Sequence, residues 1–165
     1  MVKKLNSMRL LDTHDVAYDV MRFPHHMHSA TDVATFFNLP PDMVYKTLVV
    51  LPPQGKPMLV LVAGDREIHL RQLAQTLGIK RLRMATQKEA EFLTGLKVGG
   101  ISALALQHRG FPVYIDRAAT HHDKLLVSAG QRGIDLCLKT TDLIKITDAT
   151  IIEATAKTAE RCTQQ

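Results

Sequence analysis

The sequence predicts an α+β domain in which helices pack outside a mixed or closed β-sheet. Apolar, β-branched runs of strand length recur along the chain, and short turns join several neighbouring runs. Helical segments do not alternate regularly with these runs, so a doubly wound parallel sheet is less favoured. A chain of 165 residues can bury a core of its own. We therefore expect a single domain over residues 1–148, followed by a polar C-terminal helix or tail over residues 149–165.

The N-terminal segment contains a predicted helix, a predicted strand and a group of histidines. Apolar residues at near-helical spacing predict a short helix within residues 3–12, and an alternating pattern predicts a strand over residues 16–23. His25, His26 and His28 follow in a segment that we interpret as a loop. No carboxylate or thiol lies at a supporting spacing, so a solvated histidine loop is favoured over a metal site.

A second helix is expected directly after the histidines. Ser29 is followed three residues later by Asp32, a pair that resembles a capping box and opens a helix through Phe37. The spacing of the apolar side chains leads us to expect Val33, Phe36 and Phe37 on the inward face.

A β-hairpin with one lysine in its first arm follows. Residues 43–51 (MVYKTLVVL) and residues 58–63 (MLVLVA) are the predicted arms, joined by the turn PPQGKP, and the second arm is expected to be buried on both faces. With a period of two, Lys46 shares its face with three aliphatic residues. Such an ammonium either reaches solvent at the end of the strand or is held inward for a polar task.

The second half of the chain adds two helices with clear end signals and further strands. A helix over residues 70–77 ends at Gly78, and the capping box from Thr86 to Glu89 opens another that ends at Gly95. Strands are expected over residues 79–84, 111–116, 125–128 and 134–138, with a turn over residues 129–133 and a short helical turn over residues 140–145 capped by residues 140–142.

Charge and cysteine usage narrow the class of partner. The net charge of +5 makes an anionic partner plausible, but the charge is dispersed, which suits modest phosphate contacts better than a duplex-binding surface. No apolar run approaches a membrane span and no signal peptide is evident, so we expect no membrane partner. Cys137 and Cys162 lie in no metal-ligand spacing, and we expect a reduced cytoplasmic setting with no metal and no cofactor.

A pair of glycines forms the first stretch that suggests chemistry. Gly99 and Gly100 permit positive φ or let consecutive backbone N–H groups approach a carbonyl or phosphate oxygen. A plain bulge or turn is the alternative. The chain has no Walker-type loop, no GxGxxG pattern and no GxSxG elbow, so nucleotide-loop and serine-hydrolase interpretations fail.

A glycine-containing hairpin is the second such stretch. Gly130 and Gly133 fit a turn between two strands within LLVSAGQRGIDLCL, residues 125–138. If the arms pair, Ser128 and Asp135 fall on either side of the turn and meet near one pocket. The alternative is that the serine caps the turn and the aspartate lies on the surface.

Three blocks together carry a resemblance to a known family. VYKTLVV at residues 44–50, VGGIS at residues 98–102 and VSAGQRGID at residues 127–135 resemble the signature blocks of the YbaK family, in the family's order, and the resemblance runs from about residue 16 to 147. These are free-standing aminoacyl-tRNA deacylases related to the editing domain of bacterial prolyl-tRNA synthetases. The resemblance implies a mixed, largely antiparallel, β-barrel-like sheet flanked by helices. It implies removal of a mischarged amino acid, typically cysteine from proline tRNA, with the tRNA acceptor end as partner and prolyl-tRNA synthetase as a further candidate.

The resemblance also implies a site. Lys46 would be the essential pocket lysine, and Gly99 and Gly100 would supply backbone amides near the aminoacyl carbonyl. Two positions depart from the family: Ala103 stands where its glycine loop usually has proline, and Ala30 where an aromatic residue is expected. The implied substrate-binding residues are Phe23, Tyr45, Ile101, Ser102, Ser128, Gly130 and Asp135.

These residues lead to a hypothesis and leave two alternatives open. The Lys46 ammonium is expected to contact the terminal ribose or phosphate and the ester region, in a positioning and electrostatic role. For cysteine, the resemblance implies that the substrate thiol attacks its own ester, which requires no protein nucleophile or metal. The alternatives are a non-catalytic module that binds RNA or oligonucleotides, and a deacylase for alanine or another small amino acid.

Overall fold

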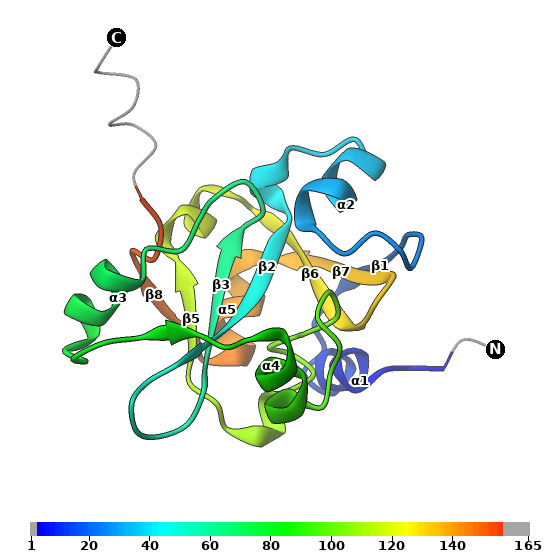
Figure 1. The fold of residues 1–165 in the computed structure, drawn as a ribbon. Coiled ribbons are helices and arrows are strands. Elements are labelled where there is room, and N and C mark those ends of the chain that lie inside the picture. Colours follow the sequence, from blue (N-terminus) through cyan, green and yellow to red (C-terminus); the bar gives the residue numbers. More distant parts are fainter. Residues whose placement is uncertain (1–2, 157–165) are drawn as a thin grey trace, which may run out of the picture.

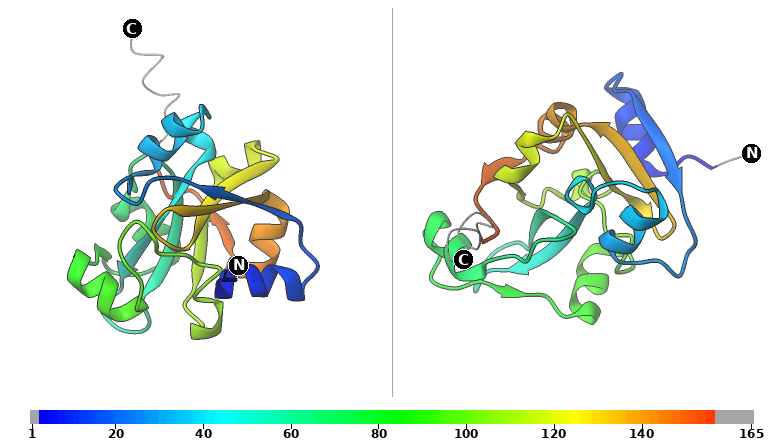
Figure 2. Two further views of the ribbon diagram at one scale, coloured as in Figure 1. Left: turned by 90° about the vertical axis from the view of Figure 1, so that its right-hand side faces the viewer. Right: turned by 90° about the horizontal axis from the view of Figure 1, so that it is seen from above.

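Two β-sheets form the centre of the molecule, and the helices lie around their outside (Figures 1 and 2). The computed structural model describes residues 3–156. One sheet has the order β1-β7-β6 and the other the order β4-β2-β3-β5-β8. The strands are β1 (Tyr18–Arg22), β2 (Tyr45–Leu51), β3 (Met58–Ala63), β4 (Arg83–Met84), β5 (Val113–Asp116), β6 (Lys124–Gln131), β7 (Ile134–Lys139) and β8 (Thr150–Ile152).

The helices occupy separate places around this centre. Figures 1 and 2 show α1 and α3 on opposite sides of the molecule. None of the helices within residues 3–156 combines the length and the apolar character that crossing a membrane requires. The α-helices are α1 (Asn6–Thr13), α2 (Ala30–Phe36), α3 (Leu70–Leu77), α4 (Gln87–Thr94) and α5 (Thr140–Thr147), and the short 3₁₀ helices are η1 (Pro41–Met43), η2 (Gln107–Arg109) and η3 (Arg117–His121).

The predicted α+β class with a mixed, largely antiparallel sheet is confirmed. The pairs β3·β5 and β5·β8 are parallel, and the other ladders are antiparallel. The sheets do not close into a barrel. They are joined by an isolated parallel bridge between Val44 and Leu126, while β1 and β8 stay at outer edges. Instead of the expected barrel, the structure has two separate sheets whose backbones are bridged at one end of β2.

Local signals located most elements correctly. Ser29 caps α2 by accepting a hydrogen bond from the Asp32 N–H, and Thr86 and Glu89 form the capping box of α4. Gly78 and Gly95 end α3 and α4 in the left-handed conformation. The hydrogen-bonding groups and the φ preference of these residues act within one turn, so tertiary contacts do not alter them.

Four expectations about the elements were wrong in detail. β4 keeps only two of the predicted residues 79–84, because only Val50 and Leu51 of β2 pair with it. The strand predicted to stop at residue 128 continues as β6 to Gln131 through a bulge. Phe36 is exposed, because α2 buries only Val33 and Ala34. The start of α5 has no side-chain cap: the Thr140 hydroxyl donates instead to the His122 carbonyl.

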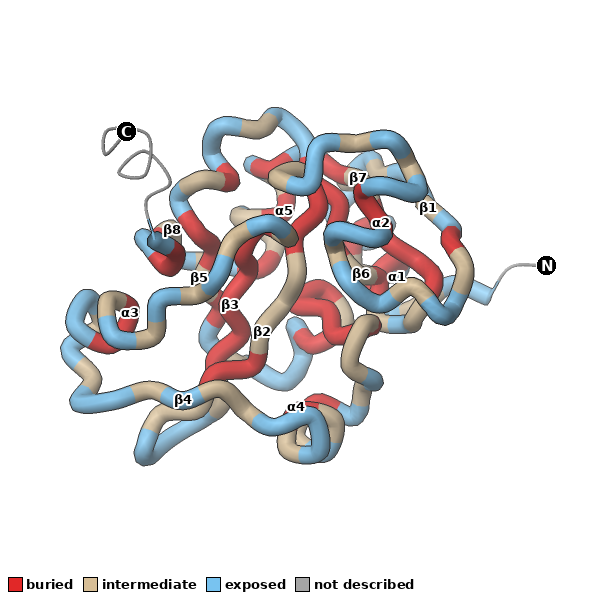
Figure 3. Tube along the Cα trace, turned by 45° about the horizontal axis from the view of Figure 1, so that its top comes forward, coloured by how far each residue is buried: buried red, intermediate tan, exposed pale blue. Residues whose placement is uncertain are grey.

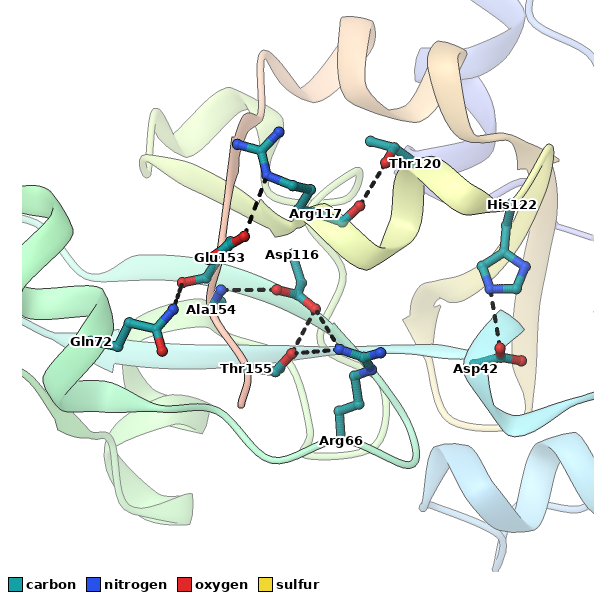
Figure 4. A network of polar contacts seen from close by, with 10 residues as sticks. All are labelled: Asp42, Arg66, Gln72, Asp116, Arg117, Thr120, His122, Glu153, Ala154 and Thr155. Carbon is teal, nitrogen blue, oxygen red and sulfur yellow. Dashed lines mark hydrogen bonds and ion pairs between the residues drawn. The ribbon is translucent and has the colours of Figure 1, made fainter. Parts of the chain in front are cut away.

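The first part of the segment that was expected to be a polar helix or tail from residue 149 is a strand. Residues 150–152 form β8, which pairs with β5 and buries Ile152. The Asp116 carboxylate fixes the segment after β8 by accepting from the Ala154 N–H and the Thr155 hydroxyl, both at 2.8 Å (Figure 4). Arg66 lies 3.9 Å from the same carboxylate. The remainder of the predicted tail, residues 157–165, lies outside the described residues.

Three apolar clusters form the core. The largest lies between the two sheets, a second lies on the face of the larger sheet that α3 covers, and a third lies under α2. All six residues of β3 are buried, as predicted, whereas β2 has a half-buried stretch at residues 46–48 (Figure 3). A central strand adjoining the core is therefore left partly open at this stretch.

Candidate active site

The half-buried stretch of β2 borders a cavity of about 370 Å³ at the junction of the two sheets. β4 pairs only with Val50 and Leu51 at the far end of β2, so β4 does not cover the edge of β2 around residues 45–48. Seven of the predicted site residues line this cavity: Phe23, Tyr45, Lys46, Gly99, Ile101, Ser128 and Asp135.

Lys46 lies in the β2 wall of the cavity. It is directly opposite Val62 in the β2–β3 ladder, next to the Leu48–Val60 pair on the same face. The face with aliphatic neighbours that the period of two predicted is therefore observed. Lys46 is half-buried, and it makes no ion pair with a protein carboxylate among residues 3–156. The cavity wall thus includes a lysine that has no carboxylate partner among the described residues.

Ser128 and Asp135 face each other across the β6–β7 hairpin. The register pairs them directly, and both line the cavity, so the predicted meeting of the two side chains is observed. The Gly130 N–H donates to the Ser128 Oγ at 3.2 Å, within the bulge that bends β6. Gly130 has a φ of +108° and is not part of the cavity wall, so it shapes the turn behind Ser128.

The Asp135 carboxyl occupies an apolar environment. It is 5% exposed, and in the part of the chain that the structure describes it has neither a hydrogen-bond donor nor a cation partner. Burial alone raises the pKa of Asp135 to about 7. Lys46 forms no ion pair with this carboxyl. The carboxyl therefore keeps its proton to a higher pH than an exposed aspartate does.

The two glycines of the 98–102 loop have different roles, which corrects the prediction for Gly100. Gly99 lines the cavity with a φ of +93°, and its N–H has no acceptor among the described residues. The Gly100 N–H instead donates to the Lys97 carbonyl at 2.7 Å. A Cβ at Gly100 would lie 2.9 Å from the backbone nitrogen of Arg132. Position 100 is therefore glycine because the loop approaches the hairpin closely, and its amide is not available to a substrate.

Ser102 also lies away from the cavity, contrary to the prediction. Its side chain is buried, and the Oγ accepts a hydrogen bond from the Ala105 N–H at 3.1 Å. Ala103 is likewise buried in the core between the sheets. Any influence of residue 103 on the substrate must therefore act through the shape of the loop.

Tyr45 contributes to the cavity wall and to the core. Its side chain belongs to the cluster between the sheets, and its hydroxyl is buried with no hydrogen-bond partner within residues 3–156. Burial, reinforced by the nearby Asp116, raises the pKa of the Tyr45 phenol. The side chain consequently acts mainly in packing.

Sequence reasoning missed two further groups of wall residues. One comes from the start of α2, where the capping signal and the histidine cluster were visible but pointed to no site. The other comes from the start of α4, whose capping box fixes its position beside β2. The missed residues are His28, Ser29 and Thr31, which flank Ala30, in the first group and Met84, Ala85, Gln87 and Ala90 in the second.

Ala30, the position where an aromatic residue was expected, packs tightly in this wall. A Cβ at Gly64 would lie 2.7 Å from the Ala30 Cβ, so the two small residues let α2 approach the end of β3. Among residues 3–156, no group of three or more His, Cys, Asp or Glu side chains is placed to hold a metal ion.

Comparison with known protein families assigns the chain to one of them. The sequence model of the aminoacyl-tRNA editing domain matches residues 24–146, a range that includes every predicted cavity residue except Phe23. The chain belongs to the aminoacyl-tRNA editing domain family. The resemblance to the YbaK group of this family is thereby confirmed.

Two proteins with similar sequences support this family assignment. A protein of Enterococcus faecalis, provisionally named Cys-tRNA(Pro)/Cys-tRNA(Cys) deacylase EbsC, is 30% identical over 158 residues, which cover 94% of this chain and 95% of the relative. The proline–tRNA ligase of Nitratidesulfovibrio vulgaris strain Hildenborough is 39% identical over 72 residues, 44% of this chain but 12% of the ligase.

A solved structure shows the same fold. It is provisionally described as a trans-editing enzyme for prolyl tRNA synthetase and matches with a TM-score of 0.77 at 22% identity. The match covers 94% of this chain and all of the other. The two-sheet arrangement therefore recurs in a protein with few identical residues.

Proposed function

We propose that this editing-domain protein is a trans-acting deacylase that cleaves the ester of a mischarged aminoacyl-tRNA. The observation that carries the proposal is the composition of one cavity: the unpaired Lys46, the free Gly99 amide and the Ser128–Asp135 pair line the same space. Membership of the editing-domain family supports the choice of aminoacyl-tRNA as substrate. The partner is the acceptor end of a tRNA, and the protein acts in the cytoplasm, where charged tRNA is used.

Lys46 and Gly99 supply the positive side of this site. The Lys46 ammonium contacts the terminal ribose or phosphate and stabilises negative charge on the ester oxygens. The Gly99 N–H donates to the aminoacyl carbonyl oxygen, which becomes more negative as the carbonyl is attacked. An aminoacyl ester is intrinsically labile, so orientation by such donors is sufficient for cleavage.

Ser128 and Asp135 supply the opposite, acceptor side. An ionised Asp135 carboxylate accepts hydrogen bonds from the α-ammonium of the aminoacyl group, and binding of that cation favours the ionised form. The Ser128 hydroxyl, fixed by the Gly130 N–H, lies beside it and offers a neutral hydrogen-bonding group. These two residues therefore orient the amino end while Lys46 and Gly99 act on the ester end.

We favour cysteine as the amino acid, because the relative matched over nearly its whole length is provisionally named a Cys-tRNA(Pro)/Cys-tRNA(Cys) deacylase. In a cysteinyl ester, the substrate sulfur attacks its own carbonyl carbon and the bond to the ribose oxygen breaks. The thiol proton is transferred to that oxygen, which leaves free tRNA and a cyclic thioester that water then opens. For alanine, water attacks the carbonyl directly. Neither route requires a nucleophile from the protein.

A panel of mischarged tRNAs tests the proposal. The purified protein is incubated with tRNAs that carry labelled cysteine, alanine or proline, and loss of label is followed. We expect rapid loss from Cys-tRNA(Pro), and we expect Lys46→Ala to slow it by about 100-fold or more, because a donor to a developing oxyanion is removed. Lys56→Ala, in the β2–β3 turn outside the cavity wall, is the matched control and should keep the wild-type rate.

One result would contradict this function, and two others would change the mechanism or the amino acid. Tight tRNA binding with no loss of any label would identify a non-catalytic RNA-binding module, whose affinity Lys46→Ala should weaken with a shallower salt dependence. A folded Lys46→Ala protein with wild-type rates would remove Lys46 from the mechanism. Preferential loss of alanine would retain the deacylase and replace the amino acid.

A further inference from the structure

Arg132, in the turn between β6 and β7, reaches across to the glycine loop. Its Nε donates to the Val98 carbonyl oxygen at 2.7 Å, and the bond is partly buried. The backbone of the same turn lies so close to Gly100 that a Cβ there would meet it at 2.9 Å. The hairpin that carries Ser128 and Asp135 is thus attached to the loop that carries Gly99.

A second charged side chain, that of Glu91, binds the backbone N–H of Val98. The Val98 N–H donates to the Glu91 Oε2, from α4, at 2.9 Å. This hydrogen bond is the main reason that the pKa of Glu91 lies below its usual value. Val98 is therefore fixed by a carboxylate at its nitrogen and a guanidinium at its oxygen, which come from two separate elements.

The bond to the Val98 oxygen also determines the direction of the Gly99 N–H. The Val98 C=O and the Gly99 N–H belong to one planar trans peptide unit, in which they point in opposite directions. Arg132 binds the oxygen, so the N–H of this unit points away from Arg132. A charge-assisted bond to the oxygen also polarises the peptide and strengthens its N–H as a donor.

From this geometry we infer that Arg132 is a positioning residue that aims the Gly99 N–H at the substrate carbonyl. The inference rests on the proposed deacylase function and adds to it a residue outside the cavity wall. Glycine has a wide range of accessible φ, so a hydrogen bond to this peptide restricts its rotation, and within residues 3–156 Arg132 is the group that binds the Val98 oxygen. Glu91 holds the preceding N–H and does not fix the plane of the next peptide by itself.

Two variants separate the hydrogen bond from the bulk of the side chain. Gln places a neutral N–H donor at the same number of bonds from the backbone as the Arg Nε, whereas Met places a methyl group there. Arg132→Gln therefore keeps a donor for the Val98 oxygen and Arg132→Met removes it. Arg109→Met is the matched control, since Arg109 also donates to a backbone carbonyl, that of Leu93 at 2.9 Å, but lies outside the cavity wall.

Steady-state deacylation of Cys-tRNA(Pro) gives the first measurement. We expect Arg132→Met to lower kcat roughly 10- to 100-fold with little change in KM, because the amide acts on the transition state. Arg132→Gln should recover most of this and stay within about fivefold of wild type, because a neutral hydrogen bond is about half as strong as a charge-assisted one. Arg109→Met should leave kcat unchanged.

The amide resonance of Gly99 gives a second measurement that requires no turnover. A probe in which an amide replaces the ester, 3′-cysteinylamino-3′-deoxyadenosine, is added to ¹⁵N-labelled protein. We expect a downfield shift of the Gly99 amide proton in wild type and in Arg132→Gln. In Arg132→Met the probe should still bind, but the Gly99 shift should be lost.

The outcomes distinguish the two proposals. A Gly99 shift as large in Arg132→Met as in wild type, or a raised KM with unchanged kcat in either variant, would overturn the positioning role. If Arg132→Met does not fold, a lost Gly99 shift in Arg132→Gln, or a fall in its kcat of much more than fivefold, would still contradict the proposal. A wild-type protein that binds the probe through Gly99 but releases no amino acid from any tRNA would overturn the deacylase and retain the amide geometry.

Discussion

Asp135 lies in the cavity wall, where its carboxyl is buried in an apolar environment. We expect the charged end of the substrate to bind it from the cavity. The Asp135 pKa of about 7 is caused by burial and by the absence of any compensating cation among the described residues. An ionised carboxylate in such a place opposes folding unless a ligand cation binds it. The residue therefore has the property of a binding group that reduces the stability of the free protein.

This property predicts a pH-dependent effect of Asp135→Asn. The folded protein holds the Asp135 proton up to about pH 7, whereas the unfolded chain releases it near its ordinary pKa of 3.8. The favourable contribution of the neutral carboxyl is thus complete below the lower value and is lost as the pH rises through the higher one. We expect the stability of the variant relative to wild type to increase by roughly 2–3 kcal/mol between about pH 5 and about pH 8.

Urea unfolding at the two pH values measures this difference. Asp19→Asn, on the exposed side of β1, is the control and should change relative to wild type by less than about 0.5 kcal/mol between them. Equal effects of Asp135→Asn at both pH values would show that the carboxyl is not destabilised by burial. The variant should also deacylate more slowly, because the α-ammonium loses its anionic partner.

At the scale of single residues, local chemistry gave part of the site and missed part of it. Ser128 and Asp135 were placed correctly because a hairpin register follows from the turn. Gly100 and Ser102 were assigned to the substrate because the resemblance placed them in the family's glycine loop, but neighbours in a tight loop point in different directions. Arg132 received no role, because the acceptor of its hydrogen bond is 34 residues away.

At the scale of the elements, a buried acidic residue at the end of β5 holds the segment that follows β8. Asp116 ends β5, is almost fully buried, and binds the Ala154 N–H and the Thr155 hydroxyl just beyond β8 (Figure 4). A carboxylate in this position needs these donors. The pairing of β8 with β5 and the burial of Ile152 depend on the same segment.

Removal of this carboxylate should destabilise the protein strongly. Asp116→Ala leaves two buried donors without an acceptor, and we expect a loss of about 3 kcal/mol in the free energy of unfolding, measured in urea. Asp42→Ala is the matched control: Asp42 pairs with His122 at 3.4 Å, but its side chain is 49% exposed, so its loss should cost less than about 1 kcal/mol. Similar small losses for both variants would show that Asp116 does not hold the β8 segment.

On the scale of the whole molecule, the two sheets share one core although they do not close into a barrel. The main cluster combines Leu59, Leu61 and Ile115 of the larger sheet with Val127 and Leu136 of the smaller one. Neither sheet can bury these side chains alone. The cavity lies beside this shared core, where β2 leaves β4 and approaches β6.

The shared core predicts that the protein unfolds as one unit, as expected for a single domain. Far-UV circular dichroism and the NMR resonances of Leu61 and Val127, one from each sheet, should lose their folded signals at the same urea concentration. Midpoints that differ between Leu61 and Val127 would show that the sheets are separate cooperative units and would contradict the single-domain prediction.

The sequence by itself determined the start of α2, the ends of α3 and α4, the two hairpins and the α+β class, because capping groups, turn glycines and period-two patterns act over a few residues. Three short motifs indicated the family. Only the tertiary structure decided that the sheets stay open, that β8 joins β5, and which members of the glycine loop face the cavity. The physical reason is distance along the chain. The Asp116, Arg132 and Val44–Leu126 contacts join segments far apart in sequence, and their geometry exists only once the whole core is packed.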